Sequence, residues 1–169
     1  GERAVVLAPG SVGAHKRWPG SPELAEALTA DGMQVWVVGG PGETEAARAI
    51  AAAAGPRARD LTGTDLRQGV LAIAAADLAV SNDSGLMHVA AATGTPTIGI
   101  FGPTSPWHWA PLNPLAAAVQ PLSLRGVEMP YHSIARRDDA SYIGSIPVSD
   151  VLDAGRGALA NAPQPQATS

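Results

Sequence analysis

The chain has no cysteine, one lysine and few charged side chains, and each shortage excludes a class of protein. Without cysteine there is no disulfide scaffold, no thiolate nucleophile and no cysteine-based zinc site. No apolar run approaches the roughly 18 residues that a membrane-spanning helix needs. A net charge of −4 without a basic run argues against nucleic acid as a general partner. Lys16 is the single lysine among eleven basic residues, which draws attention to its position.

The remaining composition is that of one globular domain. Hydrophobic residues make up 46% of the 169 residues and charged residues only 15%, which is too apolar for a disordered chain. We expect one domain over residues 1–160 and a disordered polar tail over 161–169. The chain starts without methionine and enters an apolar run at Ala4, so we expect it to be a piece of a longer protein.

Short apolar runs alternate with helix-like segments along most of the chain, which predicts right-handed βαβ units and a parallel sheet. The fold class is therefore α/β, a Rossmann-like doubly wound sheet. Strands are predicted at 4–8, 34–38, 59–61, 78–81, 97–101 and 116–120. Helices are predicted at 21–30, with Ser21 as the N-cap, and at 43–54, 64–76, 85–93 and 148–159. Residues 122–147 are expected to be irregular.

In such sheets ligands bind beyond the carboxyl ends of the strands, so the loops after the strands are the candidate site. The first loop, residues 9–19, contains Gly13 for close backbone approach, the Ser11 hydroxyl and the Lys16 ammonium. These groups suit a phosphate, although neither a Walker A loop nor a G-x-G-x-x-G motif is present. The alternative is a flexible turn with a solvated lysine.

Two further loops offer polar groups. After the second strand, Glu43 follows a run of glycines, and it either accepts hydrogen bonds from ribose hydroxyls or merely compensates a helix dipole. After the fourth strand, Asp83, Ser84 and Gly85 stand at a helix start, with His88 one turn later. They either bind an anion or simply cap the helix.

The loop after the fifth strand, residues 101–109, combines two prolines with Trp107 and Trp109. It either forms a wall of the ligand cleft or packs its tryptophans on the fold. The four histidines show no spacing typical of a metal pair, so no metal site is predicted.

Three segments together resemble a known family. They are similar to glycosyltransferase family 9, the ADP-heptose:lipopolysaccharide heptosyltransferases. The segments are the run from Asn82 to Pro96 with its continuation from Phe101 to Pro106, the opening around Pro9–Pro19, and Gly39 with Glu43. The resemblance covers residues 3–120 strongly. It implies that this chain is the C-terminal, donor-binding half of a GT-B fold.

The resemblance also implies roles for the candidate residues. Ser11 and Lys16 would hold the donor diphosphate and Glu43 the ribose, while Gly13 lies in the same donor-binding loop. Four residues would line the diphosphate and sugar site: Asp83, Ser84, Gly85 and His88. Lys16 and Asp83 would stabilise the transition state. The family's proposed base is an aspartate of an N-terminal domain, which this chain does not include.

The implied reaction is inverting, metal-independent transfer of heptose from ADP-heptose to a lipopolysaccharide-core or other glycan acceptor, without a cofactor. Implied partners are the nucleotide-sugar donor, the N-terminal GT-B domain and a glycan or glycolipid acceptor, in the cytoplasm or at the inner face of the plasma membrane. Two alternatives stay open: a nucleotide-sugar 2-epimerase-like protein, and a non-catalytic nucleotide-binding module that takes NAD.

Overall fold

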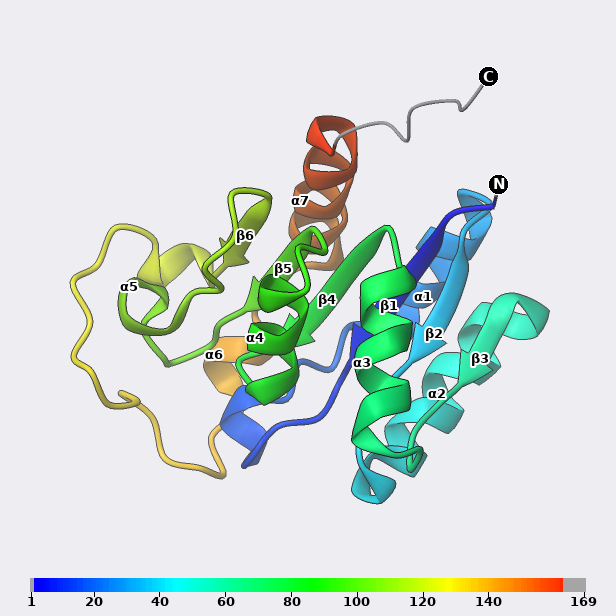
Figure 1. Cartoon of the computed structure of the whole chain (residues 1–169). Coiled ribbons are helices and arrows are strands. Elements are labelled where there is room, and N and C mark those ends of the chain that lie inside the picture. The colour runs from blue at the N-terminus through cyan, green and yellow to red at the C-terminus, as the bar shows by residue number, and fades with distance from the viewer. Residues whose placement is uncertain (1, 163–169) are drawn as a thin grey trace.

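The computed structural model describes residues 2–162, which form a six-stranded parallel sheet between two layers of helices (Figure 1). The strand order is β3-β2-β1-β4-β5-β6, the order of a doubly wound sheet, which is the predicted fold class. The strands are β1 (Ala4–Ala8), β2 (Gln34–Val37), β3 (Ala58–Asp60), β4 (Leu78–Asn82), β5 (Thr97–Ile100) and β6 (Ala116–Val119). All six strands therefore form within about one residue of their predicted bounds.

The five predicted helices also form, and several short ones join them. The long helices are α1 (Ser21–Ala30), α2 (Thr44–Ala54), α3 (Leu66–Ala75), α4 (Gly85–Ala92) and α7 (Val148–Asn161). Two single-turn α-helices and four 3-10 turns were not predicted. The α-helices are α5 (Pro106–Trp109) and α6 (Ser141–Gly144), and the 3-10 turns are η1 (Ala14–Lys16), η2 (Pro41–Glu43), η3 (Gly55–Arg57) and η4 (Leu122–Leu124). Most of 122–147 is irregular, as predicted.

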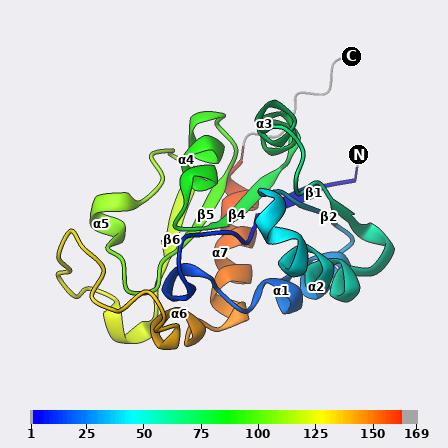
Figure 2. The ribbon, with the colours of Figure 1, turned by 90° about the horizontal axis from the view of Figure 1, so that it is seen from below.

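The central strands are apolar on both faces because each face has its own core. Helices α1, α2 and α7 cover one face and α3 and α4 the other (Figure 2). Along β1, Val5 and Leu7 join the first core, while Val6 and Ala8 join the second. This period of two follows from the alternation of side chains along a strand.

Two helix starts show how local sequence sets the helix bounds. The Asp65 carboxylate accepts a hydrogen bond from the Gln68 N–H and so caps α3. The prediction of Ser21 as the N-cap of α1 is wrong, because the helix already includes Ser21 and the cap is Gly20. A side chain at residue 20 would overlap the indole of Trp18, whose nearest atom lies 2.3 Å from the ideal Cβ position.

The C-terminal part returns to the sheet through α7. This helix continues to Asn161, the first residue of the predicted tail, and residues 163–169 lie outside the described part of the chain. The indole N–H of Trp18 donates to the Ile146 carbonyl at 3.0 Å and joins the entry of α7 to the loop after β1. Within residues 2–162, no helix combines the length and apolar character of a bilayer span.

The strand order reverses between β1 and β4, the two central strands. They pair in parallel, with Ala8 beside Ser81 at their carboxyl ends. The chain leaves β1 toward one helical layer and β4 toward the other, so the loops that follow them separate and leave a crevice. The candidate loops after the first and fourth strands, β1 and β4, lie at this point.

Gly102 lets two elements approach the end of β5. A Cβ there would lie 2.7 Å from Ile143 Cβ, 2.9 Å from the His15 carbonyl oxygen and 3.1 Å from the Ile143 nitrogen. Since backbone atoms of η1 and α6 cannot swing aside as a flexible side chain can, any added atom must displace these elements.

We expect Gly102→Ala to lower the free energy of unfolding by about 1–3 kcal/mol, the usual cost of overpacking. Gly157→Ala is the matched control, because residue 157 is exposed in α7 and a Cβ there meets open space. It should raise stability by about 0.5–1 kcal/mol. Urea unfolding followed by circular dichroism measures both, and equal effects would contradict the close approach at Gly102.

Candidate functional site

Asn82, at the end of β4, joins the two loops of the crevice. Its amide Nδ2 donates to the Pro9 carbonyl at 2.6 Å, and its Oδ1 accepts from the Trp18 N–H at 3.3 Å. The side chain is buried, with only 2% exposed. It therefore fixes both ends of the loop after β1 against the end of β4. Asn82 was not among the predicted site residues, although an uncharged amide at the end of a buried strand was a usable signal.

Lys16 and Asp83 form an ion pair across the crevice. Lys16 Nζ lies 2.8 Å from Asp83 Oδ2, and the two side chains are 26% and 8% exposed. Oδ2 is buried, and the Lys16 ammonium is the charged partner beside it. The Ser11 hydroxyl donates to the Asp83 carbonyl at 2.8 Å. The loop after β1 and the start of α4 are thus joined by both charge and hydrogen bonding.

A hollow of about 320 Å³ opens at this ion pair, and we call it the Lys16 hollow. Its lining residues are Ser11, Val12, Lys16, Asp83, Ser84, Gly85, His88 and Trp109. Six of the eight predicted binding residues therefore come together here, from two loops about 70 residues apart in the sequence. Gly13 and Glu43 are the two that do not line it.

The N-terminus of α4 forms one side of the Lys16 hollow. Gly85 is the first helical residue, and the Ser84 side chain does not cap the helix but faces the Ser81 hydroxyl at 3.2 Å. The first N–H groups of a helix have no partner within the helix and carry partial positive charge. Together with the Lys16 ammonium, they make this side of the hollow suitable for an anion.

Glu43 lies against a second hollow on the far side of the same loop. This Glu43 hollow measures about 290 Å³ and is lined by Pro9, Gly10, Arg17, Gly42, Glu43, Glu45, Ala46 and Ala49. A Cβ on Gly10 would lie 2.7 Å from the Glu43 carboxylate, and one on Gly39 or Gly40 3.2 Å from the Glu43 side chain. Glycine at these three positions therefore leaves the space that the carboxylate occupies.

Gly13 has a structural task in the same loop. Its φ is +89°, a conformation that L side chains rarely adopt, and a Cβ there would lie 2.7 Å from the His15 ring. The His15 N–H donates to the Arg137 carbonyl at 3.2 Å, which attaches η1 to the 130–140 segment. Gly13 thus turns toward that segment, while Ser11 and Lys16 turn toward the hollow.

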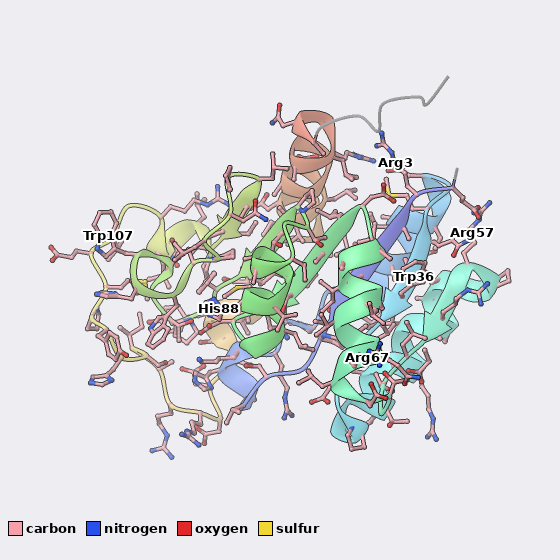
Figure 3. The ribbon with its side chains drawn as sticks, in the orientation of Figure 1. Arg3, Trp36, Arg57, Arg67, His88 and Trp107 are labelled. Carbon is pink, nitrogen blue, oxygen red and sulfur yellow. The ribbon has the colours of Figure 1, made fainter. Side chains whose placement is uncertain are left out.

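The two tryptophans of the loop after β5 behave differently. Trp109 lines the Lys16 hollow, and its indole N–H donates to the Tyr131 carbonyl at 3.2 Å. Trp107 is 93% exposed at the outer end of the molecule, away from His88 on α4 (Figure 3). Trp109 thus forms part of a cleft wall, which was one of the two predicted alternatives for this loop.

Comparison with known proteins identifies the family of the chain. The sequence profile of glycosyltransferase family 9 (heptosyltransferase) matches residues 1–126, about three quarters of the chain. The chain belongs to glycosyltransferase family 9. It is 38% identical over 148 residues to lipopolysaccharide heptosyltransferase 2 of Salmonella typhimurium, and 37% identical over 129 residues to lipooligosaccharide heptosyltransferase 2 of Haemophilus influenzae.

Solved structures of the family have the same fold. The structure of Escherichia coli ADP-heptose lipopolysaccharide heptosyltransferase II superposes with a TM-score of 0.79 and 33% identity, over 94% of this chain and 47% of that one. The Salmonella alignment covers 82% of this chain and 41% of the relative, and the Haemophilus alignment 71% and 37%. The chain therefore spans about two fifths of the curated relatives it matches. The family resemblance and the fold class are confirmed.

No group of three or more histidine, aspartate or glutamate side chains within residues 2–162 is arranged to hold a metal ion. The absence of a metal and of a cofactor in the reaction stays a prediction.

Asn82→Ala should lower the free energy of unfolding by about 1–3 kcal/mol, because it leaves the buried Pro9 carbonyl and Trp18 N–H without their partner. Asn161→Ala, at an exposed position at the end of α7, is the control and should change stability by less than about 0.5 kcal/mol. Urea unfolding of both variants measures the difference. An Asn82→Ala variant as stable as the control would show that the loops hold together without the amide.

Proposed function

We propose that this chain is the donor-binding half of a glycosyltransferase that moves heptose from ADP-heptose to the glycan core of lipopolysaccharide. The observation that carries the proposal is the position of the only lysine, whose ammonium meets Asp83 and the α4 N-terminus at the switch point of the sheet. The relatives, which are lipopolysaccharide and lipooligosaccharide heptosyltransferases, support the same conclusion.

The two hollows suit the two ends of a nucleoside diphosphate sugar. In the proposed pose the diphosphate occupies the Lys16 hollow, beside the ammonium and the first N–H groups of α4. The nucleoside crosses the loop at Gly10 into the Glu43 hollow, where ribose hydroxyls donate to the Glu43 carboxylate. Residues of one loop line both hollows, so a single ligand can contact both.

Asp83 fits a sugar better than a phosphate. A carboxylate close to a diphosphate repels it, whereas a carboxylate accepts hydrogen bonds from the hydroxyls of a sugar. We therefore assign Asp83 two tasks, holding Lys16 in position and accepting a hydrogen bond from a hydroxyl of the transferred heptose. His88 is exposed on α4 and lines the same hollow, and we assign it to the sugar end of the donor.

The proposed reaction breaks the bond between the sugar C1 and the β-phosphate oxygen, while the acceptor oxygen bonds to C1 from the opposite face. Negative charge grows on the leaving diphosphate, and Lys16 with the α4 N–H groups stabilises it there. We propose that these groups replace a divalent cation and that the reaction inverts C1. The base that takes the acceptor proton comes from the N-terminal GT-B domain, together with most acceptor contacts. Because the acceptor is a glycolipid, we place the enzyme at the inner face of the plasma membrane.

Lys16→Ala should weaken ADP binding to this chain by about 10- to 150-fold, because a charge-assisted contact to phosphate contributes about 1.5–3 kcal/mol. Lys16→Arg should recover only part of the affinity, since the guanidinium is larger and planar. Titration calorimetry with ADP, ADP-heptose and NAD measures this, and NAD should bind weakest.

Arg48→Ala is the control, because this arginine is exposed on α2 and lines neither hollow. Equal ADP affinity of wild type, Lys16→Ala and Arg48→Ala would show that the diphosphate binds elsewhere. Tighter binding of NAD than of ADP-heptose would instead favour the plain nucleotide-binding module.

The chain alone should transfer no heptose, because the proposed base lies outside it. The assay incubates the chain with ADP-heptose and lipid-free core oligosaccharide and follows ADP release and product mass. Glycosylated oligosaccharide would contradict the need for a second domain, and an isomerised sugar nucleotide would favour the 2-epimerase-like alternative.

A further inference from the structure

A third hollow lies beyond the Lys16 hollow, and the proposed donor does not use it. It measures about 470 Å³ and is lined by Trp107, His108, Gly126, Val127, Glu128 and Met129. We call it the Trp107 hollow. Its residues come from the segments that follow β5 and β6, at the end of the molecule where α5 lies (Figure 1).

Helix α5 separates this hollow from the donor hollow. Trp109 lines the Lys16 hollow, and Trp107 and His108 of the same turn line the third one. Tyr131 connects the two sides, with its ring centroid 4.9 Å from that of Trp109 and 5.6 Å from that of His108. A molecule in the Trp107 hollow would therefore be separated from the donor sugar by only one helical turn.

The lining has the chemistry of a sugar site rather than of an anion site or a purely apolar groove. The indole of Trp107 is 93% exposed and offers a flat apolar face, and Met129, only 6% exposed, lies beneath the surface. Glu128 and His108 supply hydrogen-bonding groups for hydroxyls. A mostly apolar hollow with a few polar groups is typical of a small-molecule site. Neither lysine nor arginine lines it, and the Glu128 carboxylate disfavours an acidic ligand.

We propose that the Trp107 hollow binds a neutral pyranose ring of the glycan acceptor, stacked on the Trp107 indole and hydrogen-bonded by Glu128. The proposal rests on the proposed function, and it gives this half of the enzyme one acceptor subsite of its own. Its specificity is for uncharged sugar units, since Glu128 repels a carboxylate or phosphate on the ring. Trp107 acts as a specificity-determining residue and does not touch the reacting atoms.

The indole N–H signals in a nitrogen–proton correlation spectrum test this directly. The chain has four tryptophans, and each gives one signal. Lipid-free lipopolysaccharide core oligosaccharide should move the Trp107 signal and leave those of Trp18 and Trp36, both outside this hollow, in place. ADP should move the signal of Trp109 and leave that of Trp107 unchanged. A Trp107 signal that does not respond to saturating oligosaccharide overturns the proposal.

Three variants separate stacking from mere exposure. Trp107→Ala should raise the oligosaccharide Kd, measured on the His108 amide signal, by about tenfold, as expected when a favourable aromatic contact is lost. Trp107→Phe should retain most of the affinity, because a flat ring remains. Leu112→Ala is the matched control, since Leu112 is 92% exposed on the same connection but does not line the hollow. Equal Kd values for Trp107→Ala and Leu112→Ala overturn the proposal.

Failure of this proposal and failure of the donor site give different results. If ADP and ADP-heptose do not bind, the proposed function fails, whatever the Trp107 signal does. If they bind and move Trp109 while the oligosaccharide leaves Trp107 unchanged, only the acceptor subsite fails. Oligosaccharides whose ring carries a phosphate should bind at least tenfold more weakly than the neutral form, and the reverse order would contradict the role of Glu128.

Discussion

The site depends on one buried amide. Asn82 contacts the loop after β1 at both of its ends, through the Pro9 carbonyl and the Trp18 N–H. That loop contains Ser11 and Lys16, and Asn82 itself precedes Asp83, so the same residue joins the two segments that form the ion pair. Burial makes the constraint strong. If the loop moved away from Asn82, the Pro9 carbonyl and the Trp18 N–H would lose their hydrogen bonds in a place that water does not reach.

The three hollows lie along the sheet in the order of its strands. The Glu43 hollow lies beside the loops after β1 and β2, the Lys16 hollow between the loops after β1 and β4, and the Trp107 hollow among the segments after β5 and β6. In the two proposals, a nucleoside, a diphosphate sugar and an acceptor sugar would occupy these hollows in that order, in a row along the carboxyl edge of the sheet. The parallel sheet explains the row, because every strand delivers its loop to the same edge.

The proposed anion site lies in a chain of net charge −4, and its one ammonium is paired with Asp83. In the proposed function, the attraction for an anion comes from this ammonium and from helix N–H groups, not from an excess of basic residues. Asp83 balances the ammonium, with its Oδ2 lying 2.8 Å from Lys16 Nζ. In the proposed function, the same few residues serve both the phosphates and the sugar.

The sequence by itself determined the alternation of strands and helices, and with it the sheet, because buried parallel strands and amphipathic helices leave local patterns. It also identified six residues that share the Lys16 hollow, since they stand in the loops after β1 and β4. Only the tertiary structure decided that Glu43 lies in a separate hollow, that Gly13 turns toward Arg137, and that Asn82 joins the two loops. These are contacts between segments distant in the chain, and their geometry depends on how whole elements pack, which no local pattern of residues encodes.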